Sequence, residues 1–331
     1  MKKTLLPLLL ATLCVTSCSP TNGGSEPQDD KHYQCIVDNT FQLGFTANPA
    51  NGFRQDDNWF PDERWLMDVD LTYQEEKTNP VWLVSQHGDI YSLNDKYNAL
   101  VGEKPTYENG YYTFYDESKV MSVNPSTGSL YLELNTSKEY IRPRKAQEAW
   151  CHLLLNQGFE RAVRISEVNS VDFTIDLTMK KFVDNMNGQA NSGLHATQFL
   201  MYIIVKSENA YDAHDYFWFG IPFFDNRYPN GLPEYGHIDA GGAGATSKFI
   251  YGMPSADYLP NGLPLNETQK VNVDIKPYLG AALIKAQSLG FFTNSVLNDL
   301  TFQSMNIGFE IPGSYDCGIE ISNFSLTANY K

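Results

Sequence analysis

The residues best suited to bind a ligand lie in an aromatic stretch that covers residues 216–228. If this stretch is a strand, its successive side chains point to opposite faces of a sheet. Phe217 and Phe219 then fill the core, while Tyr216 and Trp218 lie on the other face. Trp and Tyr join a large flat contact area to a polar tip, which suits them to bind the apolar faces of sugar rings.

Polar side chains are expected on the same face as these two rings. Gly220 leaves room beside them for a ligand. The polar candidates, taken from this stretch and from two other alternating segments, are Gln198, Tyr202, Asp225, Arg227, Asn306 and Glu310. Together they predict a polar trough around an aromatic floor, which is typical of a glycan-binding face. Two alternatives stay open: a merely solvated sheet face, or rings that lie under a loop.

The sequence holds no complete catalytic motif. GxSxG, HExxH, a P-loop and a GxGxxG after a strand are all missing from it. There is also no close trio of acidic residues on one strand, the arrangement with which sandwich glucanases place an acid near a nucleophile. A uronate lyase would need a base and a group that neutralises the carboxylate. His195 or Tyr202 could be that base and Arg227 the neutralising group, with Gln198 assisting.

Nothing in the sequence requires a cofactor. A transition-metal site could be built from three histidines, His195, His214 and His237. No pair among them has the spacing that metal ligands have on a helix or a strand. The chain has no CxxC pair for a thiolate zinc site. Oxygen ligands in the Asp- and Asn-rich loops fit a structural Ca²⁺ better.

The composition excludes several classes of partner. The 331 residues contain 24 Lys and Arg against 39 Asp and Glu, a formal net charge of -15. A nucleic-acid-binding protein needs clustered basic residues, and so does a protein that docks on anionic lipid through a basic patch. A hydrophobic content of 42% with 19% charged residues indicates a globular chain with a substantial core.

Most of the chain alternates as strands do. Residues 171–177 and 195–206 place apolar and polar side chains on opposite faces, and 306–311 does the same. Residues 277–290 have apolar side chains at helical spacing, with Gly290 placed to end the helix. The pattern predicts an all-β jelly roll or β-sandwich with one short helix. A basic run at 142–145 suggests a boundary between a small β domain, 33–141, and the jelly-roll domain, 143–331.

The first residues predict export and a lipid anchor. Lys2 and Lys3 precede an apolar run, and Val15-Thr16-Ser17-Cys18 resembles the lipobox of bacterial lipoproteins. We therefore expect a signal peptide at 1–17, a lipid on Cys18 and a flexible tether at 18–32. Gln28-Asp29-Asp30 in the tether resembles the acidic export tag of outer-surface lipoproteins, so we expect a protein anchored in the outer membrane and exposed at the cell surface.

Three cysteines remain in the mature body of the protein. Cys35, Cys151 and Cys317 are an odd number, so one disulfide is possible, and the sequence does not choose its pair.

The larger predicted domain also carries a family resemblance. It opens with Trp150-Cys151-His152-Leu153-Leu154-Leu155 and closes with residues 308–313 and 321–326. These sequence segments and the order of the predicted elements resemble those of β-sandwich modules of carbohydrate-active enzymes in outer-surface polysaccharide-utilisation systems. The resemblance implies a lipoprotein that binds polysaccharide or oligosaccharide near glycan-processing proteins. A polysaccharide lyase or glycoside hydrolase on the same sandwich is one alternative, and a structural or adhesive surface protein is another.

Overall fold

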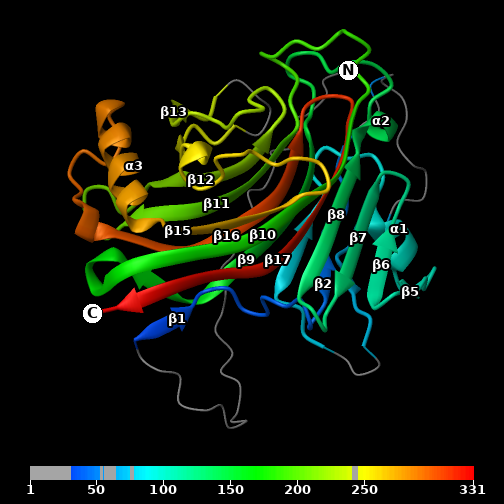
Figure 1. Cartoon of the computed structure of the whole chain (residues 1–331), viewed down its shortest axis with the longest axis horizontal. Helices are drawn as coiled ribbons and strands as arrows, with labels where there is room; N and C mark the ends of the chain where they lie inside the picture. Colours follow the sequence, from blue (N-terminus) through cyan, green and yellow to red (C-terminus); the bar gives the residue numbers. More distant parts are fainter. Residues whose placement is uncertain (1–30, 53–54, 56–64, 75–77, 241–244) are drawn as a thin grey trace, which may run out of the picture.

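Two β-sheets packed face to face make up the body of the protein (Figure 1). The computed structural model describes residues 31–52, 55, 65–74, 78–240 and 245–331. Within them the eight-stranded sheet contains, in spatial order, β15 (Thr268–Asp274), β10 (Val168–Asp184), β17 (Tyr315–Tyr330), β8 (Ser129–Asn135), β7 (Lys119–Asn124), β6 (Tyr111–Tyr115) and β5 (Thr106–Glu108), with β1 (His32–Gln34) paired to β17.

The second sheet has nine strands among the described residues. Its order is β13 (Tyr235–Ile238), β14 (Phe249–Gly252), β12 (Tyr216–Asp225), β11 (Gln198–Ser207), β16 (Leu300–Ile311), β9 (Cys151–Arg164), β4 (Trp82–Ser85), β2 (Phe45–Ala47) and β3 (Val69–Leu71). Its neighbours are antiparallel except at β12–β14 and β2–β4, which are parallel.

Strand alternation places the core where the sequence predicts it. In β10, Val171, Phe173, Ile175 and Leu177 are fully buried, while the residues between them lie on the outer face of the sheet. Side chains that alternate in this way can pack against a second sheet on one side and face solvent on the other. The predicted all-β sandwich is confirmed.

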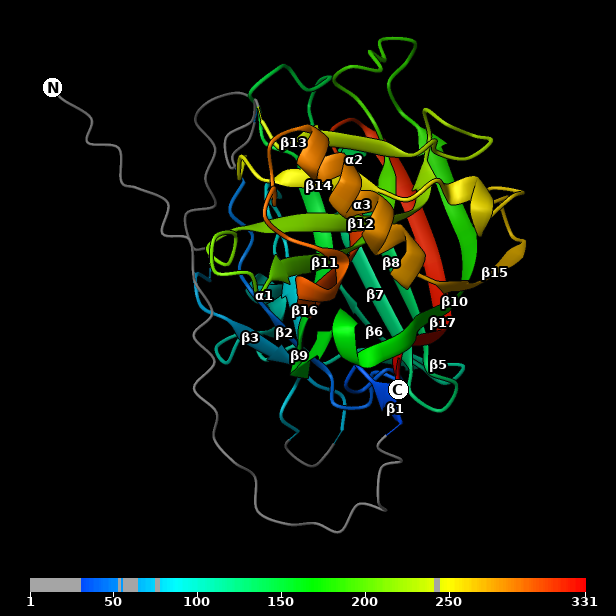
Figure 2. The same ribbon diagram turned by 90° about the vertical axis from the view of Figure 1, so that its left-hand side faces the viewer.

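The predicted helix is also present, as α3 (Lys276–Ser288). Pro277 lies in its first turn, where the missing N–H group has no cost, and Leu279 and Leu283 are among its buried residues. Gly290 follows the helix with a φ of 86°. Figure 2 shows α3 lying across one side of the sandwich, where it contacts β13 and β14. Two shorter helices that the sequence did not predict are α1 (Leu93–Tyr97) and α2 (Thr136–Glu139).

The predicted division into two domains differs from the observed strand pairing. Strands of residues 33–141 extend both sheets, because β8 pairs with β17 and β4 pairs with β9. The core is continuous as well, and the rings of Trp82 and Phe324 stack with their centroids 6.1 Å apart.

The basic run that suggested the boundary is folded into the body of the protein. Arg142 forms an ion pair with Glu148, with 2.6 Å between Nη2 and Oε1. Arg144 is 6% exposed and donates hydrogen bonds to the carbonyl groups of Lys145, Glu148 and Leu194. The composition shift at 142–145 therefore reflects local bonding of two guanidinium groups rather than a linker.

The three body cysteines, Cys35, Cys151 and Cys317, are free, buried thiols. Burial raises the pKa of each thiol, that of Cys35 to about 12. No helix in the described part of the chain is both long and apolar enough to cross a bilayer. The predicted signal peptide, Cys18 and nearly all of the tether lie outside the described residues.

Candidate functional site

Strand β12 has the two faces that the sequence predicts. Phe217 and Phe219 are fully buried, whereas Tyr216 and Trp218 are partly exposed on the outer face of the nine-stranded sheet. The Trp218 ring meets Tyr216 nearly edge-on, with centroids 5.6 Å apart, and it meets Tyr202 of β11 at 5.8 Å. These rings form one aromatic surface, which we call the aromatic floor and define as Tyr202, Tyr216, Trp218 and Tyr235.

Two glycines allow the floor to lie close to the sheet. A Cβ atom on Gly220 would come within 2.9 Å of the Tyr202 ring, and one on Gly252 would come within 2.0 Å of the Tyr235 ring. The sequence predicted that Gly220 would leave space for a ligand. That space instead holds the ring of Tyr202, which faces Gly220 across the β11–β12 pair.

Tyr235 is a member of the floor that the sequence reasoning missed. It lies on β13, a short edge strand, and its ring stacks with His237 at a centroid distance of 5.6 Å. Burial raises the pKa of both Tyr202 and Tyr235, that of Tyr235 to about 12. The alternation of Tyr235 and His237 was the available signal, but four residues are too few to identify a strand from sequence.

A row of polar residues crosses the sheet beside the floor. Glu310 of β16 lies in register with Gln198 on one side and with His152 of β9 on the other. Asn306 lies in register with Tyr202 and with Asn156. The predicted residues Gln198, Tyr202, Asn306 and Glu310 therefore share one face, as their alternation suggested. His152 and Asn156 extend that face onto β9.

Glu310 is a carboxyl group of this face whose pKa is raised into the neutral range. Burial raises its pKa to about 7, and the negative charge of Asp239 adds to the effect. Asp239 accepts hydrogen bonds from the backbone N–H and the hydroxyl of Thr246, both at 2.7 Å. The Thr246 hydroxyl in turn accepts a hydrogen bond of 3.4 Å from Trp218 Nε1. Asp239, which the sequence reasoning also missed, thus connects its loop to the aromatic floor.

Asp225 and Arg227 form a bidentate ion pair at the end of β12. The buried carboxylate of Asp225 accepts from Arg227 Nη2 at 2.6 Å and from Nε at 2.9 Å. Gln198 Nε2 donates to the same carboxylate at 3.0 Å. Because its charge is already matched, Arg227 is poorly placed to neutralise the carboxylate of a substrate.

The two residues proposed as the base of a lyase, His195 and Tyr202, are also poorly suited to that role. His195 is 5% exposed, its Nδ1 accepts from the backbone N–H of Asn191 at 2.9 Å, and its Nε2 donates to the Arg144 carbonyl at 2.8 Å. Both ring nitrogens are therefore used to hold a loop. Burial raises the pKa of Tyr202 well above its ordinary value, which keeps the phenol protonated at neutral pH. The arrangement does not favour the lyase alternative.

The structure does not assemble the histidine trio that could be drawn from the sequence. Among the described residues, the His, Cys, Asp and Glu side chains close enough to share a metal ion are Asp89, Glu139 and Cys151. These three side chains are buried, and none of the three histidines belongs to the group.

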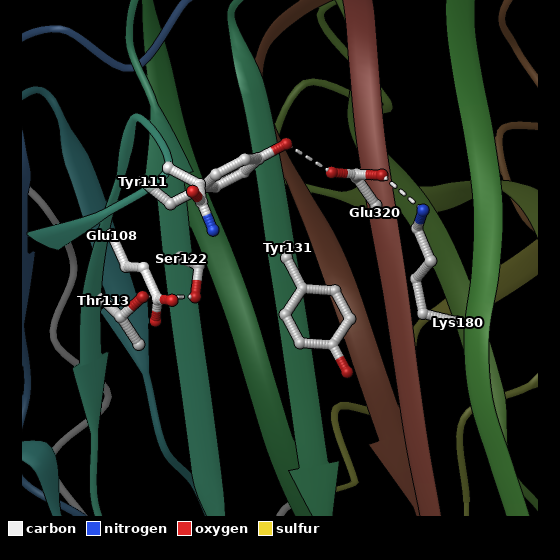
Figure 3. Close-up of a pocket in the computed structure, with 8 residues that line it drawn as sticks. Glu108, Tyr111, Thr113, Ser122, Tyr131, Lys180 and Glu320 are labelled. Atoms are coloured by element: carbon white, nitrogen blue, oxygen red, sulfur yellow. Dashed lines mark hydrogen bonds and ion pairs between the residues drawn. The ribbon is translucent and has the colours of Figure 1, made fainter.

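The outer face of the eight-stranded sheet carries a second polar surface (Figure 3). It is a hollow of about 460 Å³ lined by Glu108, Asn109, Tyr111, Thr113, Ser122, Tyr131, Lys180 and Glu320. Tyr111 donates to Glu320 at 2.7 Å, and Lys180 forms an ion pair with the same carboxylate at 2.9 Å. Because Glu320 is matched by Lys180 and Tyr111, we interpret this hollow as a solvated face that ties β6, β17 and β10 together.

Together these observations define an all-β sandwich protein with an aromatic floor and a polar row on the outer face of its larger sheet. No protein family matches the chain, and no curated protein matches it either.

Solved structures that are similar to the chain include an endoglucanase, Cel12A from Rhodothermus marinus, with 13% identity over 67% of this chain and 93% of that one, at a TM-score of 0.36. A family 12 xyloglucanase from Bacillus licheniformis has 15% identity over 68% and 97%, at a TM-score of 0.39. A family 11 xylanase from Neocallimastix patriciarum has 8% identity over 67% and 93%, at a TM-score of 0.33. At these values the likeness assigns no activity to the chain.

Proposed function

We propose that the outer face of the nine-stranded sheet binds a glycan, with the aromatic floor under the sugar rings and the polar row beside their hydroxyls. The observation that carries this proposal is the partly exposed ring of Trp218, held in place by Tyr202, Tyr216 and the hydrogen bond to Thr246. A ring that is already fixed loses little conformational entropy when a ligand stacks on it.

The polar row favours an uncharged glycan. Glu310 and Asp239 contribute carboxyl groups to this face, while the charge of Arg227 is matched by Asp225. An anionic polysaccharide would meet like charges here, and the whole chain has a net charge of -15. Carboxyl and amide groups can instead bind hydroxyls, which donate and accept hydrogen bonds.

The site extends beyond the floor toward β9. Trp150 is 39% exposed, and its ring lies nearly parallel to that of His152 at 6.4 Å between centroids. Because His152 is the register partner of Glu310, aromatic surface lies on both sides of the polar row. We infer an oligosaccharide or polysaccharide ligand rather than a single sugar.

We also propose that the protein is a lipoprotein held at the outer surface of the cell, near other glycan-processing proteins. The support is the sequence Val15-Thr16-Ser17-Cys18 and the acidic segment after it. A flexible tether lets a bound polymer be kept within reach of neighbouring proteins on the same membrane, which raises its effective concentration there.

Substituting Cys18 tests the anchor. Cys18→Ala is expected to give a chain without lipid, because the thiol of Cys18 is the group that would take the diacylglycerol. Membrane fractionation and mass spectrometry of the N-terminal peptide measure the result. A variant that still carries lipid would show that the anchor lies elsewhere.

A second candidate function is hydrolysis of the bound glycan, which the raised pKa of Glu310 favours. A carboxyl group with a pKa of about 7 is suited to donate a proton to a leaving glycosidic oxygen at neutral pH. Asp239, which accepts two hydrogen bonds from Thr246, would be the second carboxylate of such a pair. In this mechanism Glu310 is the general acid and Asp239 is the base or nucleophile.

The pKa of Glu310 predicts a pH-dependent stability that does not depend on either function. Between the ordinary value of 4.5 and about 7, the folded chain binds more protons at this site than the unfolded chain does. The free energy of unfolding should therefore fall as pH rises through this range. Glu310→Gln removes the effect, so the variant should equal the wild type below pH 4.5 and exceed it in thermal stability above pH 7. If the melting temperatures of the wild type and of Glu310→Gln changed with pH in the same way across this range, the raised pKa of Glu310 would be contradicted.

A glycan panel that measures binding and product release separates the functions. Affinity for a neutral polysaccharide without new reducing ends supports a binding protein. New reducing ends that disappear in Glu310→Gln and in Asp239→Asn support a hydrolase. Neither binding nor turnover on a broad panel would favour a structural or adhesive surface protein and overturn the proposal.

A further inference from the structure

The interior holds a buried cluster that neither proposed function uses. Lys119 of β7 is fully buried, and its Nζ faces three carboxyl groups: Asp89 Oδ2 at 3.3 Å, Asp116 Oδ2 at 3.1 Å and Glu139 Oε1 at 3.6 Å. All four side chains are at most 3% exposed. Asp89 follows β4 of the nine-stranded sheet, and Lys119 belongs to the eight-stranded sheet, so the cluster bridges the two sheets.

The charges of this cluster do not balance. Four ionised groups would leave two uncompensated negative charges in an interior where even one is costly. Burial accordingly raises the pKa of Asp89 well above its ordinary value and raises that of Glu139. Burial therefore favours the protonated form of Asp89, which lies beside Lys119. Burial lowers the pKa of Lys119, but the charges of Asp116, Asp89 and Glu139 outweigh this effect and raise it.

The surroundings give the three carboxyl groups different roles. Asp116 Oδ1 accepts hydrogen bonds from the backbone N–H groups of Ser118 at 2.8 Å and Lys119 at 2.7 Å, which hold this side chain in the turn before β7. Glu139 is oriented by the backbone N–H of Ile90 at 2.6 Å and by the hydroxyl of Ser118. Oε1, the oxygen that accepts from Ser118, also lies 3.6 Å from Nζ, where it can accept or return a proton. Asp89 is the carboxyl group that reaches Lys119 from the opposite sheet.

We propose that Lys119 and Asp89 condense to form an intramolecular amide bond, with Glu139 as the residue that moves the proton. Glu139 takes one proton from the ammonium group, and the freed Nζ electron pair attacks Cγ of the protonated Asp89. The C–N bond forms, a second proton from nitrogen reaches the departing hydroxyl, and the C–O bond breaks. One water molecule leaves, Glu139 ends protonated, and neither an oxidant nor a cofactor is needed.

This step neutralises two buried charges together. The Lys119 ammonium group becomes part of a neutral amide and the Glu139 carboxylate becomes a neutral acid, so the net charge of the cluster does not change. The same Lys119 argues against a metal at the neighbouring Asp89, Glu139 and Cys151 donors, because its positive charge lies within 3.6 Å of the Asp89 and Glu139 oxygens and would repel a cation. The product would be a covalent link between the two sheets.

Mass spectrometry of the full chain tests the proposal. Peptide mapping of the denatured, digested protein should give one joined peptide that contains residues 89 and 119, lighter by one water molecule than its two parts. Glu139→Gln should leave the two peptides separate while the chain stays folded by circular dichroism. Asp89→Asn offers a sharper control: the same attack would release ammonia instead of water, so the joined peptide should have the same mass as that of the wild type, although the unreacted peptide that contains residue 89 differs in mass.

Two results would overturn the proposal. Separate peptides of full mass from the folded wild-type chain would show that Lys119 and Asp89 form only an ion pair. A single peptide that contains residues 116 and 119 and is lighter by one water molecule would show that the reactive carboxyl group is wrongly assigned. The wild-type measurement decides the question even if a variant fails to fold.

Discussion

A chain that begins at Pro143 is expected to lose cooperative folding. It would lack β8, the partner of β17 along residues 316–321, and β4, the partner of β9. It would also lose Phe45, Trp82 and other fully buried side chains of residues 33–141 from the shared core. Exposed strand edges and an open core leave too little burial to offset the conformational entropy of folding.

Urea titrations followed by far-UV circular dichroism measure this effect. The matched control begins at Lys31 and retains every strand that the structure describes, so it should unfold in one cooperative transition. The shorter chain should show a broad transition or none. A sharp transition for the chain that begins at Pro143 would restore the two-domain division that the composition suggested.

Phe219→Ala is expected to cost about 3–5 kcal/mol of stability, because it would leave a large cavity in a fully buried site. Phe219 is 0% exposed, and its ring stacks on that of Tyr251 at 5.6 Å. The neighbouring Trp218→Ala should cost much less, since Trp218 is partly exposed on the other face of the strand.

Equilibrium unfolding of both variants in urea compares the two neighbours under one set of conditions. They differ by one position on β12, so the strand itself is the same in both experiments. If Trp218→Ala proved the more damaging change, the ring would have a structural role and the outward face would be assigned to the wrong residues.

Local alternation was enough to predict the parts of the fold that depend on neighbouring residues. Phe217 and Phe219 point inward and Trp218 outward because a strand has a period of two, whatever the rest of the chain does. The same period placed Gln198, Tyr202, Asn306 and Glu310 on one face. Pro277 and Gly290 similarly marked the ends of α3 through their own backbone preferences.

Features that depend on contacts between distant segments could not be predicted in this way. Nothing local indicates that β8 pairs with β17, or that the Tyr202 ring covers Gly220. Strand register across the sheet likewise decides that His152 lies beside Glu310. The buried position of Lys119 was hidden for the same reason, because a lysine in a short strand is usually solvated.

Titration calorimetry of Trp218→Ala with a glycan that the wild-type chain binds tests the central proposal most directly. Loss of a stacking ring of this size should weaken affinity about tenfold to a hundredfold, or about 1–3 kcal/mol. Tyr107→Ala is the matched control, since Tyr107 is a 64% exposed aromatic residue on β5 of the other sheet. We expect the control to bind as the wild type does. Unchanged affinity in Trp218→Ala, or an equal loss in Tyr107→Ala, would contradict a glycan site on the aromatic floor.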